Sequence, residues 1–185
     1  MKILQNKKAL STVVTTLIIL VVSVLLATVV TFYAINVTTT RVQEESLFLT
    51  KPHIWYNTTG DWAEGAIVIV NTGGKDVVID KISVRGQECN WSEVYFYRSN
   101  ALTVSQDITV TPNEPTADFN QTVEGTPRLF TAATGDLTLK SGWTVVLYMH
   151  NPDSIALNDV GITVGITVFT SNAQYYKEVN VEAAQ

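Results

Sequence analysis

The chain has 185 residues, with 12 Lys and Arg against 17 Asp and Glu, and a formal net charge of −5 at pH 7. Hydrophobic residues make up 46% of it and charged residues 16%, which excludes an intrinsically disordered protein. The acidic balance argues against nucleic-acid binding, because phosphate contacts need clustered Lys and Arg. The single cysteine, Cys89, excludes an internal disulfide and a CxxC metal site.

An uncharged segment lies near the N-terminus, between Lys8 and Arg41. Its centre, residues 13–35, is long enough to cross a bilayer as a helix, which takes about 20 apolar residues. It exceeds the apolar core of an ordinary secretory signal, which has about 7–15 residues. Three lysines precede the segment and acidic residues follow it, so we expect a cytoplasmic N-terminus and an external remainder.

Small residues recur along one face of this predicted helix. At roughly 100° per residue, a stripe of small side chains falls on a single side. Such stripes let helix backbones approach closely in a membrane or in a filament core. A plain signal anchor also contains scattered small residues, so the stripe alone does not decide between the two. The stripe residues are Thr12, Thr16, Ser23, Ala27, Thr31 and Ala34.

Beyond residue 41 the sequence indicates β-structure, with short apolar or alternating runs between Gly, Pro and Asn turns. The turn at 71–74 predicts a hairpin between its flanking runs. Gly165 suggests a bulge, and residues 112–127 are expected to form an exposed loop. We therefore predict an α+β protein, with a long N-terminal hydrophobic helix followed by an all-β, Ig-like sandwich. The expected strands are 66–70, 76–84, 91–97, 101–110, 136–140, 142–149, 161–170 and 173–181.

The body sequence offers no convergent catalytic, cofactor or metal motif. Cys89, His53 and His150 lack the spacing of a nucleophile with its base or of a metal site. We therefore expect no enzyme activity, cofactor or metal. The aromatic residues are expected to pack in the core or between subunits, although Trp55 and Trp62 would be contact residues if exposed. Glu44 and Glu45, at the helix exit, are expected to be solvated.

Four N-x-S/T sequons lie beyond the centre of the apolar segment, and in an exported protein they are candidates for N-glycosylation. In a Thr-rich chain they also arise by chance, as plain surface polarity. Asn57 and Asn120 are favoured because we expect them in loops, whereas Asn36 is disfavoured by its place near the apolar segment. The sequons begin at Asn36, Asn57, Asn90 and Asn120.

The N-terminal order is the most specific signal: a basic leader ends in Lys7, Lys8 and Ala9, and Leu10 opens the apolar helix. It resembles the class III signal peptide of archaeal type IV pilins. The resemblance implies that a prepilin peptidase cuts between Ala9 and Leu10. The mature chain would lose three lysines and keep nine basic residues against 17 acidic ones, a net charge of −8. Val14 stands at the fifth mature position, where bacterial type IV pilins usually carry Glu, so the archaeal branch fits better.

The resemblance implies three parts: a removed leader (1–9), a helix that spans the membrane before assembly and forms the filament core afterwards (10–49), and an extracellular sandwich (50–185). It also implies a peptidase and an ATP-driven assembly platform as partners, with other copies of the chain as the main partner. We expect a structural subunit of an adhesive surface filament. The alternatives are an archaellin-like motility subunit, a single-pass membrane-anchored extracellular binding module and, ranked last, a surface enzyme.

Overall fold

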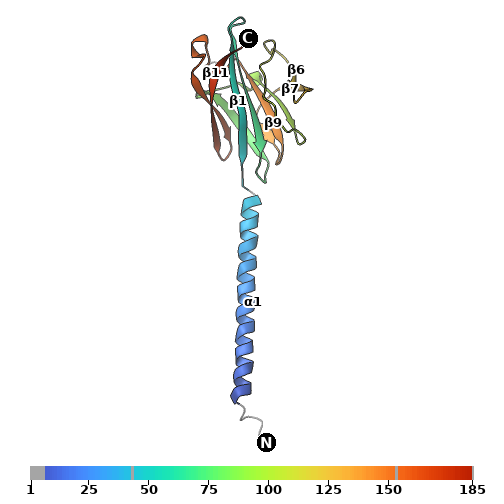
Figure 1. The fold of residues 1–185 in the computed structure, drawn as a ribbon, viewed down its shortest axis with the longest axis vertical. Helices are drawn as coiled ribbons and strands as arrows, with labels where there is room; N and C mark the ends of the chain where they lie inside the picture. Colours follow the sequence, from blue (N-terminus) through green and yellow to red (C-terminus); the bar gives the residue numbers. More distant parts are fainter. Residues whose placement is uncertain (1–6, 43, 153, 185) are drawn as a thin grey trace. The chain divides into compact units, whose positions relative to one another are not determined.

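The computed structural model describes residues 7–42, 44–152 and 154–184, and only the backbone of residues 7–9, 41 and 42. The chain divides into two units, residues 1–43 and residues 44–185. The first holds the helix α1 (Lys7–Val42), and the second, here called the body, holds the strands (Figure 1). The predicted α+β fold, an apolar N-terminal helix followed by a β-sandwich, is confirmed.

Helix α1 is 36 residues long and contains neither Gly nor Pro, so nothing in its sequence interrupts the backbone hydrogen bonds. At 1.5 Å per residue it measures roughly 54 Å. The helix ends at Val42 and β1 begins at Leu47. The predicted boundary at residues 49/50 is therefore too late, because the first strand already starts inside the segment assigned to the helix.

The described residues of the body form eleven strands in a continuous hydrogen-bonded order, β4-β3-β10-β11-β1-β2-β9-β5-β7-β6, with β8 paired to β3. Two short 3-10 helices, Trp91–Glu93 and Leu157–Asp159, interrupt the connections. The strands are β1 (Leu47–Asn57), β2 (Trp62–Asn71), β3 (Val77–Val84), β4 (Gln87–Glu88), β5 (Val94–Ser99), β6 (Phe119–Val123), β7 (Thr126–Ala132), β8 (Leu137–Leu139), β9 (Thr144–His150), β10 (Thr163–Thr170) and β11 (Gln174–Ala184).

The strand order is that of an Ig-like sandwich. One layer has the order β1-β2-β9-β5, and the other has β3-β10-β11, which correspond to the A-B-E-D and C-F-G sheets of an immunoglobulin domain. Strand β11 joins the layers. Its first part pairs antiparallel with β10, and its last residues, from Val181, pair parallel with β1.

The main core lies between the two layers. It contains fully buried residues from both, including Ile54, Ile67 and Leu147 from the first layer and Ile82 and Ile166 from the second. Aliphatic β-branched and Leu side chains dominate this core, as expected for packed inner faces of two sheets.

A second core lies on the opposite face of the first layer, where it is covered by the chain between β5 and β9. Phe130 and Tyr148 meet edge-to-face with their ring centroids 5.1 Å apart, and Phe119 stacks on Phe130 at 5.3 Å. Val68 and Val146 contribute from β2 and β9. Strands β2 and β9 are consequently buried on both faces, which explains why they read as continuous apolar runs instead of alternating ones.

The covering chain includes the β6–β7 hairpin, which turns at Glu124 and Gly125, both with positive φ (52° and 70°). Two consecutive positive φ values are those of a type I′ turn, the tight turn that matches strand twist. The prediction of an exposed loop over 112–127 was therefore wrong for its second half. The Pro and polar residues of that segment concealed a short strand pair.

The strand predicted at 101–110, where Leu102, Val104, Ile108 and Val110 alternate with polar residues, is absent. Leu102 and Ile108 are buried in the second core, but residues 100–118 contain no strand. The polar groups of this segment form hydrogen bonds or ion pairs with side chains of the strands and of the β6–β7 turn, in place of hydrogen bonds to a neighbouring strand. Their contacts are Lys51 Nζ to the carbonyl oxygen of Ser105 (2.6 Å), His53 Nε2 to Asp107 Oδ1 (2.9 Å), Glu64 to Thr111, Tyr148 OH to the carbonyl oxygen of Thr109 (2.8 Å), Glu124 to the amide of Gln106 (2.6 Å) and His150 Nε2 to Glu114 Oε1 (3.2 Å).

The hairpin predicted around residues 71–74 was also wrong, because β2 and β3 lie in different layers and do not pair. The buried Asn71 side chain shapes this crossing. Its amide nitrogen donates to the carbonyl oxygens of Lys75 (2.8 Å) and Leu139 (3.0 Å), and its amide oxygen accepts from the Gly73 amide (3.0 Å). A polar turn can thus cross between sheets as well as join neighbouring strands.

Gly165 does not form the predicted bulge, because the register of β10 with β11 runs through it without a break. The register of β10 with β3 shifts between Phe169 and Thr170, where β3 has one extra residue, Asp80. A Cβ at Gly165 would meet the Tyr176 ring at 2.2 Å, so this glycine is needed for the close approach of that ring.

Among the described residues of the body, Glu64 is the most deeply buried carboxyl. It is fully buried and accepts hydrogen bonds from the amide (2.8 Å) and the hydroxyl (2.9 Å) of Thr111. Burial raises the pKa of Glu64 from 4.5 to about 7, and the Thr111 bonds offset this only in part. Between about pH 4.5 and pH 7 the unfolded chain loses the Glu64 proton while the folded body keeps it. The free energy of unfolding therefore falls as the pH rises through this window.

We expect Glu64→Gln to stabilise the body at pH 8 by up to ~3 kcal/mol, because 1.36 kcal/mol accompanies each pKa unit. The gain should shrink toward zero at pH 5, where native Glu64 is protonated. Chemical denaturation of both proteins at pH 5, 6, 7 and 8 measures the difference. Parallel stability curves over this range would contradict the assignment of a buried, titrating Glu64.

Candidate functional site: the surface of the N-terminal helix

The surface of α1 is apolar on all sides. From Leu10 to Thr40 it presents 31 uncharged residues, long and apolar enough to cross a membrane. All of them are exposed, including 18 large hydrophobic side chains. Burying such a side chain is worth at least about 1.5 kcal/mol, so exposure of this surface to water would cost on the order of 25 kcal/mol. That exceeds the usual stability of a whole domain, about 5–15 kcal/mol, and the helix surface must therefore be covered by lipid or protein.

The Ser and Thr hydroxyl groups of α1 from Thr15 to Thr40 are satisfied within the helix itself. Every Ser and Thr from Thr15 to Thr40 donates to a backbone carbonyl three or four residues earlier, as Ser23 does to Ile19 (2.7 Å) and Thr31 to Ala27 (2.7 Å). Asn36 donates in the same way to Phe32 (3.0 Å). These polar atoms consequently need no water, which lowers the cost of placing the helix in an apolar environment.

The predicted stripe of small side chains lies on exposed helix surface throughout. Ala27 and Thr31, with Thr28, form the floor of a shallow hollow whose rim includes Val24, Phe32 and Ile35. The remaining stripe residues, Thr12, Thr16, Ser23 and Ala34, continue the same side of the helix, as the 3.6-residue turn requires. A neighbouring helix could approach more closely at Ala27 and Thr31 than at the positions that carry Leu and Ile.

The structure describes the predicted processing residues only in part. The backbone is helical from Lys7, so the bond between Ala9 and Leu10 lies within α1. The side chains of Lys7, Lys8 and Ala9 lie outside the described residues. Leu10 is 70% exposed. Cleavage at this bond stays a prediction.

The body begins with a tightly held segment, residues 44–46. The amides of Thr72 and Gly73 donate to the carbonyl of Ser46 (2.9 and 3.0 Å), and the amide of Gly74 donates to that of Glu44 (3.3 Å). A Cβ at Gly73 would meet the Glu44 oxygen at 2.6 Å, so this turn requires glycine. The chain is thus fixed to the sandwich directly after residue 43.

Glu45 anchors this segment and is not the solvated residue expected from the sequence. Its side chain is only 7% exposed and lies 3.8 Å from Lys75 Nζ. It accepts hydrogen bonds from the Thr170 hydroxyl and from Asn172 Nδ2 (2.9 Å). Glu44, by contrast, is exposed as predicted. Strand β1 begins two residues after Glu45, at Leu47, and Glu45 is in phase with the buried positions Leu47 and Leu49 of this strand.

The sequon asparagines occupy different environments. Asn120 is exposed on β6, and Asn57 is a half-buried residue at the end of β1 whose side chain accepts from the amides of Thr59 and Gly60 (2.9 Å each). Both therefore lie in strands, and the expectation that they lie in loops was wrong. Asn90 is exposed and caps the first 3-10 helix. Asn36 lies on α1. Glycosylation at any of the four stays a prediction.

The residues with catalytic or metal-binding chemistry do not converge. Cys89 is buried in the main core, while His53 and His150 pair separately with Asp107 and Glu114. Among the described residues, no three His, Cys, Asp or Glu side chains are grouped to hold a metal. Trp55 and Trp62 are buried, at 7% and 5% exposure, so they are not surface contact residues.

Comparisons with known proteins give weak structural neighbours only. No family model matches the chain, and no curated protein matches it. A solved structure described as the copper-bound PCuAC domain from PmoF2 covers 76% of this chain and 99% of its own, at 13% identity and a TM-score of 0.34. A structure of manganese lipoxygenase of Gaeumannomyces graminis with part of zonadhesin of Komagataella pastoris covers 70% and 45%, at 18% identity and a TM-score of 0.25. At such low TM-scores, neither neighbour informs the function of this chain.

Replacing Glu45 with Ala should destabilise the body by about 1–3 kcal/mol, because Thr170 and Asn172 lose their acceptor. The matched control is Glu44→Ala, which removes an exposed carboxylate next to it and should stay within about 0.5 kcal/mol. Thermal unfolding followed by near-ultraviolet circular dichroism measures both. Equal effects of the two substitutions would contradict the anchoring role of Glu45.

Proposed function

We propose that this chain is a structural subunit, a pilin, of an archaeal type IV pilus-like surface filament that polymerises through α1. The observation that carries the proposal is a helix that is apolar on all sides, with internally satisfied hydroxyls, directly behind the Lys-Lys-Ala leader. Its mechanism is assembly and not catalysis. The chain uses two apolar environments in turn: lipid before assembly and the water-free core of a helical filament afterwards.

Removal of the leader has a physical reason in this scheme. Lys2, Lys7 and Lys8 hold the precursor's N-terminus at the cytoplasmic face. Within a filament core the same charges would be buried without partners, at a cost of several kcal/mol each. A prepilin peptidase that cuts before Leu10 leaves a helix that opens with uncharged residues, which an ATP-driven platform can then transfer out of the membrane.

The small-residue stripe supports helix-to-helix packing in the proposed core. Lipid tails are as apolar as Leu, so the hydrophobic effect does not drive helices together inside a membrane. Close van der Waals packing along small side chains does, and Ala27 and Thr31 lie in the hollow that would receive a neighbour's side chains. The acidic, Thr-rich body would form the outer sheath, with adhesion to surfaces or cells as its use and N-linked glycans as candidate additions.

The first test of this function is the N-terminal peptide of the protein in filaments sheared from the native cell surface. We expect mass spectrometry to find a start at Leu10 in a high-molecular-weight fraction. A start at Met1, found only in membranes, would refute the pilin proposal and favour the single-pass anchored binding module. Filaments that support swimming instead of attachment would favour the archaellin alternative.

Charge or bulk in the stripe should block assembly. Ser23→Asp and Ala27→Asp are expected to abolish filaments while the body still unfolds at its normal temperature. Since a buried Asp also hinders membrane insertion, by about 3 kcal/mol, the amounts of inserted and processed precursor are measured beside the filament yield.

Ala27→Leu separates packing from insertion, because it adds bulk to the stripe without charge. Its matched control is Val29→Leu, which adds bulk on the opposite side of the helix. We expect Ala27→Leu to lower the filament yield at least about tenfold and Val29→Leu to leave it nearly unchanged. Normal filaments from both Ala27 variants would exclude the stripe as the packing surface.

A further inference from the structure

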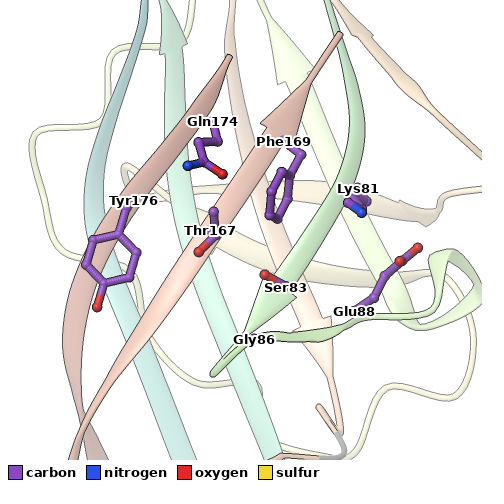
Figure 2. A pocket seen from close by; sticks show the side chains of 8 residues that line it. All are labelled: Lys81, Ser83, Gly86, Glu88, Thr167, Phe169, Gln174 and Tyr176. Atoms are coloured by element: carbon purple, nitrogen blue, oxygen red, sulfur yellow. The ribbon is translucent and has the colours of Figure 1, made fainter. Parts of the chain in front are cut away.

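A hollow lies on the outer face of the second layer, where β3, β4, β10 and β11 present their outward side chains (Figure 2). Its volume is about 330 Å3, at the lower end of the range of about 300–1,000 Å3 for small-molecule sites. The strand register places its lining in two rows across the sheet. One row is Glu88, Ser83, Thr167 and Tyr176, and the next is Lys81, Phe169 and Gln174.

The hollow exists because small residues lie between large ones. Ser83 and Thr167 are paired across β3 and β10 and form the floor. Phe169 and Tyr176 rise on either side of Thr167, and Glu88 and Lys81 lie along the β3 side (Figure 2). The floor therefore carries hydroxyl groups, while the rim carries aromatic rings, an amide, an ammonium group and a carboxylate.

Tyr176 supplies a flat aromatic surface at the edge of the hollow. Its ring is packed over Gly165, where an added Cβ would meet ring atoms at 2.2–2.8 Å. The residue nevertheless stays 59% exposed, and in Figure 2 the ring is seen almost face-on, lying along the strands. One face of the ring thus packs on the backbone while the other is open to solvent. A glycine weakens the interior of a strand and often marks a position where another group approaches the backbone closely, as the Tyr176 ring does here.

Polar groups in the hollow lack partners within the described part of the chain. Ser83 is only 5% exposed, and its hydroxyl lines the hollow without donating to any described residue. The side chains of Thr167 and Gln174 likewise form no hydrogen bond with a described residue. These donors and acceptors are therefore available to a ligand that enters the hollow. Lys81 lies over Phe169, 4.8 Å from the ring centroid, which leaves Tyr176 as the open ring.

We propose that this hollow binds a neutral saccharide, with one sugar ring stacked on Tyr176 and its hydroxyls bonded to Ser83, Thr167 and Gln174. Sugars combine an apolar C–H face with a dense set of hydroxyl donors and acceptors, and the hollow offers both kinds of partner side by side. Its two charged lining residues, Lys81 and Glu88, have opposite signs. The acidic chain as a whole would repel a polyanionic glycan, which favours an uncharged sugar.

The proposal deepens the adhesive role proposed above and rests on it for its biological use, whereas binding itself is a property of the body. The test uses the full chain in zwitterionic micelles without sugar head groups. The probes are neutral tetrasaccharides of glucose, mannose and galactose, with an acidic tetrasaccharide of galacturonate for comparison. Saturation-transfer difference NMR measures binding and identifies the sugar protons that touch the protein.

We expect at least one neutral tetrasaccharide to bind through its ring C–H protons. Tyr176→Ala should weaken binding about tenfold, because it removes the stacking surface, and Gln174→Ala should weaken it by a smaller factor. Tyr176→Phe keeps the ring and should retain most of the affinity. Leu129→Ala, a matched truncation at a 52% exposed position on β7, should leave binding unchanged.

Several results would overturn the proposal. They are the absence of binding by every neutral probe, stronger binding of the acidic probe, and binding that survives Tyr176→Ala in a folded protein. A fourth concerns a second copy of the chain as the occupant: Gln174→Cys that reacts with maleimide in micelles but not in filaments would mean that neighbouring subunits cover this face. Saccharide binding by a chain that never forms filaments would keep the site and refute the pilin, and filaments without binding would do the reverse.

Discussion

The structure depends first on keeping the surface of α1 away from water. A helix with large apolar side chains on all sides and no charge from Leu10 to Thr40 has no stable place in an aqueous monomer. Because its Ser and Thr hydroxyls from Thr15 onward bond to the helix's own carbonyls, few of its polar groups are left unsatisfied in an apolar environment. This surface suits the lipid environment and the packing against other copies of the chain that are proposed above.

The body, by contrast, buries its hydrophobic side chains within itself, and its own chain covers the outer face of its first layer. The chain between β5 and β9 covers the outer face of that layer and buries aromatic residues such as Phe130 and Tyr148 there. Its irregular part, residues 100–118, is fixed by side chains from the sheet, among them Glu64 and Tyr148. These contacts replace the strand pairing that the backbone lacks, so the polar groups of the segment are satisfied without a regular ladder.

The sequence predicted the elements whose pattern depends on local periodicity. The apolar helix was found because its uncharged run is long, and the strands near residues 142–149 and 161–170 were found because short apolar runs lie between turn residues. Alternation over residues 101–110 predicted a strand that is absent, although Leu102 and Ile108 are buried, because the alternation does not reveal whether a neighbouring strand is available for pairing. Strand β1 was missed, since Pro52 interrupts its pattern at a register shift between Thr50 and His53. The hollow on the second layer was invisible, because Ser83, Thr167 and Tyr176 meet only through cross-strand register.

The two outer faces of the sandwich are therefore unequal. The first layer's outer face is closed by the chain's own insertion, while strand β10 of the second layer alternates fully buried with half-buried residues and leaves its outer face open. A ligand or partner of the body must use that open face, the strand edges or the loops. On the open face, Gly165 gives up side-chain packing so that the Tyr176 ring can lie flat, and stability alone would have favoured a β-branched residue there. The loss of stability is confined to this position of β10, and it allows the Tyr176 ring to lie exposed on the open face.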